Sequence, residues 1–95
     1  MTGTIQYLKD GVARNIPAGS FVPFEMEPTY NRIGTVSVSN NGKFELRLRS
    51  EYRYDWMTDR VKFQYVEDGV IYEASFTNLN SLNDFSGPII LDPIQ

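Results

Sequence analysis

The sequence predicts an all-β protein, a small antiparallel β-sandwich of about seven strands. Apolar and polar residues alternate in several short segments, turn-forming residues recur between these segments, and no segment keeps a period of 3.6 residues over three turns. The chain has 95 residues, which is enough for one domain with a modest core. Residues 1–95 are therefore expected to form a single domain.

The pair Asn41-Gly42 is the clearest structural signal in the chain. It lies between two alternating segments, residues 36–39 and 43–49. Asn-Gly between such segments favours a tight hairpin, because a type I′ turn needs positive φ at both central residues. In residues 43–49 the apolar residues share one face and the charged residues share the other. This alternation predicts one buried face and fixes the pairing register.

Other expected strands follow the same alternation. Turn residues at 9–11 and 67–69 separate strands, and residues 78–87 leave room for one short helical turn. Pro23 cannot donate to a β-ladder, so its segment is expected at a sheet edge or at a bulge. Besides a weak extended stretch at 12–16, the remaining expected strands cover residues 4–8, 21–27, 33–39, 61–66, 70–77 and 88–91. The apolar faces predict a core that includes Phe44, Leu46, Phe63, Tyr65, Tyr72 and Phe76.

Composition narrows the functional classes. The chain contains no cysteine and no histidine, which excludes thiolate zinc sites, cysteine nucleophiles and Ser-His-Asp catalysis. The net charge of the chain is −3, whereas proteins that bind nucleic acid usually carry an excess of basic residues. No apolar run is long enough to span a membrane. Residues 1–4 do not begin a signal peptide. We therefore expect no cofactor, no metal, no nucleic acid and no membrane contact.

A set of turn and packing residues in the first half of the chain follows a known order. The matching residues are Gly3, Tyr7, Gly11, residues 18–22, Thr35 and residues 41–46. This order resembles the prealbumin-like β-sandwich of carboxypeptidase regulatory-like modules, and an immunoglobulin-like sandwich is a similar description. The resemblance implies a binding or structural unit without catalysis.

Two groups of carboxylates are candidates for chemical sites. Glu25 and Glu27 share one face of an expected strand, where a carboxylate pair could serve acid–base chemistry. Their neighbours Phe24 and Met26 would form the buried face, so a solvated pair is favoured. Residues 51–59 carry three carboxylates that could hold a cation, but pairing with nearby arginines is the simpler interpretation. The sequence therefore predicts a protein that is not an enzyme.

The segment from Tyr52 to Met57 is the main candidate for partner binding. Tyrosine, tryptophan, arginine and methionine are enriched at protein interfaces, and binding residues concentrate in loops. The alternative is that these rings cap an open end of the fold. The predicted partner-binding residues are Tyr52, Arg53, Tyr54, Trp56 and Met57.

The apolar C-terminal segment is a second interface candidate. Residues 88–94 either close the sheet within the chain, which is favoured, or pair with a neighbouring subunit by strand addition. The residues that would form this second interface are Ile89, Ile90, Leu91 and Ile94.

These observations predict a non-enzymatic structural or interaction domain with a protein partner in a capsid or larger assembly. A phage capsid decoration or virion accessory protein fits a chain without cysteine or export signal, made in the cytoplasm and carried on a virion surface. The alternative is an extracellular module, cut from a secreted multidomain protein, that binds carbohydrate or tethers neighbouring domains.

Overall fold

The computed structural model describes residues 1–27, 31–49 and 60–94. Strands dominate these residues, and a single turn of 3-10 helix and one short α-helix accompany them. The elements are β1 (Thr2–Lys9), β2 (Val12–Asn15), β3 (Phe24–Glu27), β4 (Asn31–Val38), η1 (Asn40–Gly42), β5 (Lys43–Leu48), β6 (Arg60–Glu67), β7 (Val70–Phe76), α1 (Leu79–Asn83) and β8 (Ile89–Ile94).

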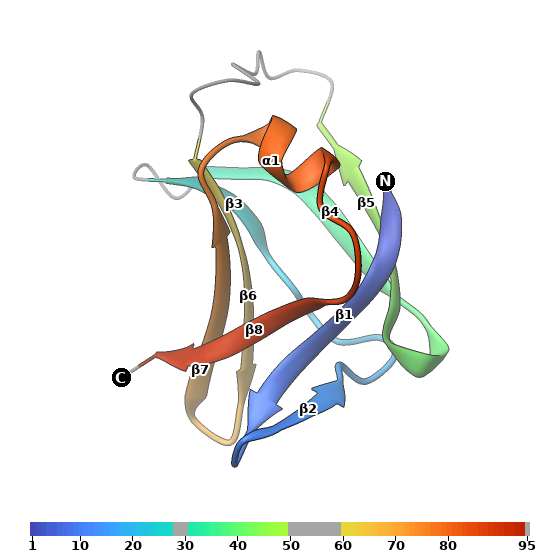
Figure 1. Cartoon of the computed structure of the whole chain (residues 1–95), viewed down its shortest axis with the longest axis vertical. Helices are drawn as coiled ribbons and strands as arrows, with labels where there is room; N and C mark the ends of the chain where they lie inside the picture. Colours follow the sequence, from blue (N-terminus) through green and yellow to red (C-terminus); the bar gives the residue numbers. More distant parts are fainter. Residues whose placement is uncertain (28–30, 50–59, 95) are drawn as a thin grey trace.

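The described strands form a closed barrel, so the predicted sandwich is wrong. Seven of them pair in the order β1-β5-β4-β3-β6-β7-β8, and β8 pairs with β1 to complete the circle. The closing contact is parallel and matches Ile5, Gln6 and Tyr7 with residues 89–91. The remaining strand, β2, forms a hairpin with β1 outside this circle. Figure 1 shows the chain leaving α1 and β8 then running from the middle of β1 toward β7.

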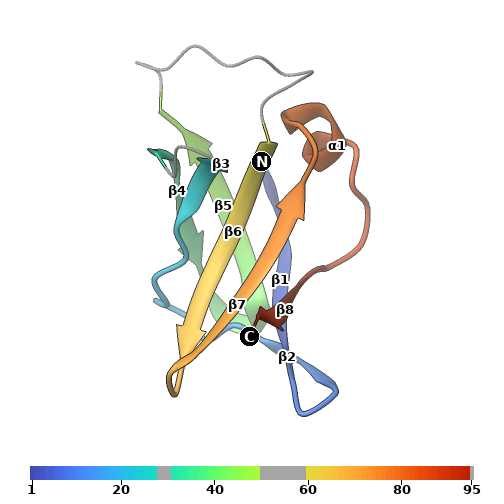
Figure 2. The same ribbon diagram turned by 90° about the vertical axis from the view of Figure 1, so that its left-hand side faces the viewer.

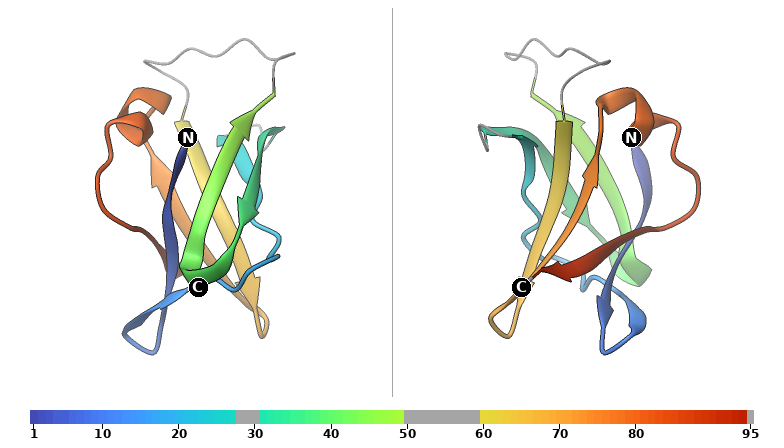
Figure 3. Two further views of the ribbon diagram at one scale, coloured as in Figure 1. Left: turned by 90° about the vertical axis from the view of Figure 1, so that its right-hand side faces the viewer. Right: turned by 60° about the vertical axis from the view of Figure 1, so that its left-hand side comes forward.

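The strand β1 takes part in three pairings because its two halves have different neighbours. Residues 2–4 pair with β5, whereas residues 6–9 pair with β2. Residues 5–7 also pair with β8. Turns at Asp10-Gly11 and Asp68-Gly69 join β1 to β2 and β6 to β7, and both residues of each turn have positive φ. In Figures 2 and 3 these two turns lie at one end of the barrel and α1 lies at the other.

The core fills the barrel interior. Phe24 and Phe63 are fully buried and lie opposite each other on adjacent strands, with ring centroids 4.8 Å apart. Leu79 and Leu82 of α1 are buried as well, so the helix covers one end of the barrel. Of the predicted core residues five are buried and the sixth, Phe76, is partly buried against the others.

The hairpin at Asn41-Gly42 forms with positive φ at both residues, as predicted. It is one residue longer than expected, since residues 40–42 form the loop and Ser39 N–H donates to the Lys43 carbonyl at 2.7 Å. Of the two alternatives expected for residues 21–27, the sheet edge is wrong, because β3 lies between β4 and β6. The bulge agrees with the shift of register between Phe24 and Glu25 in the pairing of β3 with β4. Pro23 precedes that strand and accepts a hydrogen bond from Gln64 N–H through its carbonyl, so the ladder needs no donor from it.

Candidate functional site

Three tyrosine rings fill the barrel at the end formed by the β1–β2 and β6–β7 turns. The Tyr7 ring centroid lies 5.1 Å from that of Tyr65 and 5.1 Å from that of Tyr72, and all three side chains are buried. The hydroxyls of Tyr7 and Tyr65 donate to Oε1 of Glu67 at 3.2 and 3.1 Å. Nζ of Lys9 donates to Oε2 of the same carboxylate at 3.2 Å. The cluster therefore closes this end of the barrel, with the hydroxyls of Tyr7 and Tyr65 hydrogen-bonded to the Glu67 carboxylate.

The electrostatics of this tyrosine cluster do not favour proton transfer at neutral pH. Hydrogen bonds from Tyr7, Lys9 and Tyr65 hold the pKa of the Glu67 carboxyl below its usual value. Burial, reinforced by the hydrogen bond to Glu67, raises the pKa of Tyr65 to about 12, and burial also raises the pKa of Tyr7. A more acidic carboxyl is a poorer base and a less acidic phenol is a poorer acid. The cluster is suited to holding three strands together.

The tyrosine cluster predicts how stability depends on pH. The lowered pKa of Glu67 contributes stability above pH 4.5, the ordinary pKa of this group. That contribution is lost as the pH falls through the pKa that Glu67 has in the folded protein. The raised pKa of Tyr65 contributes stability below 10.0 that is lost as the pH rises toward about 12. Urea unfolding at a series of pH values should show both losses.

The variant Glu67→Gln isolates this contribution from the other carboxylates. The difference in unfolding free energy between the parent and Glu67→Gln should be largest near neutral pH and should shrink below pH 4.5. A difference that stays constant from pH 7 to pH 3 would mean that the Glu67 carboxyl has an ordinary pKa in the folded protein.

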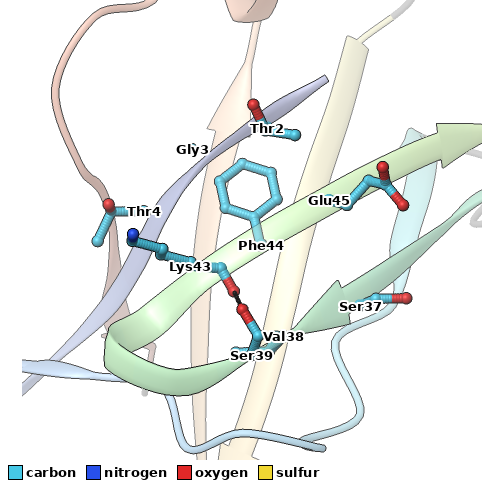
Figure 4. Close-up of a pocket in the computed structure, with 9 residues that line it drawn as sticks. All are labelled: Thr2, Gly3, Thr4, Ser37, Val38, Ser39, Lys43, Phe44 and Glu45. Carbon is cyan, nitrogen blue, oxygen red and sulfur yellow. Dashed lines mark hydrogen bonds between the residues drawn. The ribbon is translucent and has the colours of Figure 1, made fainter.

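A shallow trough of about 520 Å³ crosses β1, β4 and β5 (Figure 4). Hydroxyl-bearing and charged side chains from the outer face of these strands surround it. Stacking against a sugar needs an exposed ring, but Phe44, the one aromatic residue in its lining, is 4% exposed and belongs to the core. The lining residues are Thr2, Gly3, Thr4, Ser37, Val38, Ser39, Lys43, Phe44 and Glu45. This face of the barrel has the character of an ordinary solvated surface.

Unlike the trough, the outer face of β6, β7 and β8 carries three apolar side chains that lie in a row. The β-ladder pairs Val66 with Ile71, and Ile71 with Ile94. They point away from the core because their neighbours Tyr65 and Tyr72 point into it. Their exposed fractions are 55%, 37% and 45% along the row. We call these three residues the apolar row and take it as the candidate functional site.

Phe21 extends the apolar row beyond β6. It is 66% exposed, the highest value among the large apolar side chains of residues 1–27, 31–49 and 60–94. Phe21 and Val66 line the same hollow of about 370 Å³, together with Pro23 and Gln64. The guanidinium carbon of Arg32 lies 4.7 Å from the centre of the Phe21 ring, a cation–π contact that orients the ring. The exposed apolar surface thus continues over four neighbouring segments.

Polar residues border the apolar row one step along the strands. The ladder places Gln64 opposite Glu73, and Glu73 opposite Asp92. Oε2 of Glu73 accepts from Lys62 Nζ at 2.7 Å and from Gln64 Nε2 at 2.9 Å. Lys62 is 7% exposed although it belongs to the outer face. An apolar centre with a polar border is the usual anatomy of a protein interface.

The four residues of the second interface predicted from sequence point to two different sides of β8. Ile89 and Leu91 are 3% and 0% exposed inside the barrel, so neither can contact a partner. Ile90 and Ile94 point outward and are 39% and 45% exposed. The segment closes the sheet within the chain, the alternative that the sequence favoured. The first predicted interface, residues 52–57, lies outside the described residues.

Sequence reasoning missed Phe21, Val66 and Ile71. A signal was present for two of them, since Val66 and Ile71 interrupt the polar faces of their strands and flank the two-residue Asp68-Gly69 turn that pairs them. Phe21 has no such signal, because it precedes the strand.

The carboxylate pair on β3 takes part in surface pairing. Glu27 accepts from Arg60 Nε at 3.4 Å and from Ser75 Oγ at 3.0 Å, and Glu25 lies opposite Lys62 in the ladder. In residues 1–27, 31–49 and 60–94 no three acidic side chains gather closely enough to hold a metal ion. The same residues include no helix of the length and apolarity that crossing a bilayer requires. Comparison of the chain with protein-family models, with curated proteins and with solved structures gives no match.

Proposed function

We propose that this chain is a non-enzymatic interaction domain that binds a protein partner through the apolar row. The observation that carries the proposal is the ladder register, which sets Val66, Ile71 and Ile94 side by side on an outer surface that is polar elsewhere on β1, β4 and β5. Single exposed apolar residues are common, whereas contiguous ones mark interaction surfaces. Phe21 supplies the large ring that interfaces favour.

The chemistry of the polar clusters supports a role without catalysis. Glu67 and Glu73 are both occupied by hydrogen bonds from neighbouring side chains, and Glu67 has a lowered pKa. Catalytic acids and bases usually have pKa values shifted toward neutrality. Nothing in the described residues favours a reaction over a binding role.

The identity of the larger assembly stays a prediction. The virion hypothesis was stated for a small β-sandwich, and the closed barrel removes that part of its support. The absence of cysteine still fits this hypothesis. Carbohydrate binding, the alternative, gains no support from the trough on β1, β4 and β5, whose aromatic residue is buried.

The central residue of the apolar row tests the proposal. A photoreactive amino acid placed at Ile71 should crosslink a discrete protein in the native host, and the same group at Ser37, in the polar trough on β1, β4 and β5, should not. Ile71→Asp should then weaken binding to the captured protein at least tenfold, about 1.4 kcal/mol, because it puts a charge at the centre of an apolar contact. The variant should remain folded, since Ile71 lies outside the core.

Ser37→Asp is the matched control, as it adds the same charge at an exposed position of β4 that lines the polar trough and not the hollows around Phe21. If Ile71→Asp does not fold, Val66→Asp, at the most exposed position in the row, replaces it. Equal crosslinking from positions 71 and 37, or equal binding by both aspartate variants, would remove the apolar row from the interface.

A further inference from the structure

Two carboxylates stand directly opposite each other beside the apolar row. Glu73 on β7 faces Asp92 on β8, one step along the strands from the pair Ile71 and Ile94. Like charges at directly opposed positions destabilise a sheet. Glu73 is compensated by Lys62, 2.7 Å away. Asp92 is exposed, and no side chain in the described part of the chain forms an ion pair with it.

The other flank of the apolar row is acidic as well. Glu67, whose carboxylate accepts hydrogen bonds from Tyr7 and Tyr65, ends β6, and Asp68 begins the turn that follows with a side chain that is 79% exposed. A single cation, Lys9, serves both carboxylates, at 3.2 Å from Glu67 and 3.4 Å from Asp68. Negative charge therefore exceeds positive charge on both sides of the row along the strand direction.

The spacing within the apolar row suits a helix better than a strand. Neighbouring strands lie about 4.8 Å apart, so the three side chains recur at that interval and span about 10 Å. Side chains on one face of a helix, at positions i, i+3, i+4 and i+7, recur at about 5–6 Å. Side chains on one face of an extended segment recur at roughly 6.7 Å.

We infer that the partner presents a short amphipathic helix with apolar residues flanked by lysine or arginine, which lies across β6, β7 and β8. This inference rests on the proposed function and names the chemistry of the partner. Basic side chains beside the apolar stripe meet Asp92 on one flank and Asp68 on the other. A second copy of this chain fits less well, because packing one apolar row on another brings the acidic flanks of both copies together in a protein of net charge −3.

Three designed peptides of equal length and high helix propensity test the inference. One carries leucine at helical spacing flanked by lysine, the second replaces each lysine with glutamate, and the third replaces each leucine with glutamine. Titrated into the isotope-labelled full chain, the leucine–lysine peptide should shift the amide signals of Val66, Ile71 and Ile94. Each of the other two should bind at least tenfold more weakly.

Two variants that reverse a charge test whether peptide binding depends on the acidic flank of the apolar row. Asp92→Lys should reduce binding of the leucine–lysine peptide and improve binding of the leucine–glutamate peptide. Glu45→Lys makes the same change of charge on the polar outer face, where Glu45 pairs only with exposed Arg47 among the described residues, and should leave both affinities within about twofold.

The possible outcomes separate the two proposals. Equal binding of the lysine and glutamate peptides, abolished in both cases by Ile71→Asp, would overturn the basic-helix inference and leave the apolar row as an interface. Peptide binding that does not change in Ile71→Asp would overturn both. Concentration-dependent dimers of the chain that disappear in Ile71→Asp would make the occupant a second copy and overturn the inference as well.

Discussion

Replacing Phe63 with alanine is expected to lower the free energy of unfolding by about 3–5 kcal/mol. The side chain is fully buried, and its ring centroid lies 4.8 Å from that of Phe24, 5.8 Å from Phe44 and 6.3 Å from Phe76. These rings come from β3, β5 and β7, so truncation leaves a cavity that several strands would have to move to fill. Urea unfolding monitored by circular dichroism measures the loss.

Val66→Ala is the matched control on the same strand. Its side chain is 55% exposed, and its truncation should change the free energy of unfolding by no more than about 0.5 kcal/mol. A domain of this size has a total stability of about 5–15 kcal/mol, so Phe63→Ala should lose a large part of it. Comparable small effects of the two substitutions would show that Phe63 does not lie in the barrel interior.

Gly42→Ala is expected to have the second large effect, because two separate penalties apply. Gly42 has φ +71°, a conformation that costs a residue with a side chain on the order of 1–3 kcal/mol. A Cβ atom there would also lie 2.8 Å from the carbonyl oxygen of Ile5 and 3.0 Å from Asn15. Ile5 pairs with β8 and lies between the residues of β1 that pair with β5 and those that pair with β2. The clash therefore falls where three strand pairings meet.

Gly69→Ala separates the two penalties. Gly69 has φ +77°, yet a Cβ atom built there meets no other atom within 4 Å. Gly69→Ala should therefore show the conformational cost alone, and Gly42→Ala should lower the melting temperature clearly further in the same thermal unfolding experiment. Equal shifts would mean that the close approach between the 40–42 loop and β1 is absent in solution.

Local structure could be predicted from sequence where neighbouring residues determine it. The turns at Asn41-Gly42 and Asp68-Gly69 need positive φ, and the alternation beside them set the buried faces of β5, β6 and β7. Phe44, Leu46 and Phe63 consequently lie in the core, as expected. These features depend on contacts between residues close in the chain or joined by a tight turn.

Barrel closure could not be predicted in this way. It depends on the parallel pairing of residues 5–7 with 89–91, which are separated by almost the whole chain. Alternation predicts which side chains are buried but is the same for a strand in a sandwich and a strand in a barrel. A parallel pair also has no turn signal, because its strands are not joined by a hairpin.

One part of the candidate site depends on a local turn, and the other part depends on pairing between strands far apart in the chain. The pairing of Val66 with Ile71 follows from the Asp68-Gly69 turn, and could have been inferred before the fold was known. The position of Ile94 beside Ile71 depends on where β8 joins the sheet, as does the opposition of Glu73 and Asp92. The complete apolar row and its acidic flank therefore depend on the register of β8 beside β7.

Interstrand nuclear Overhauser effects of β8 test the account most directly. The closed barrel predicts backbone contacts from Gln6 to Ile90 and from Ile71 to Ile94 in the same sample. A mixture of labelled and unlabelled chains should show that both contacts are intramolecular. Contacts between β8 and β7 without contacts between β8 and β1 would contradict the closed barrel. Absence of the contact between Ile71 and Ile94 would mean that the apolar row, on which the proposed function rests, does not form.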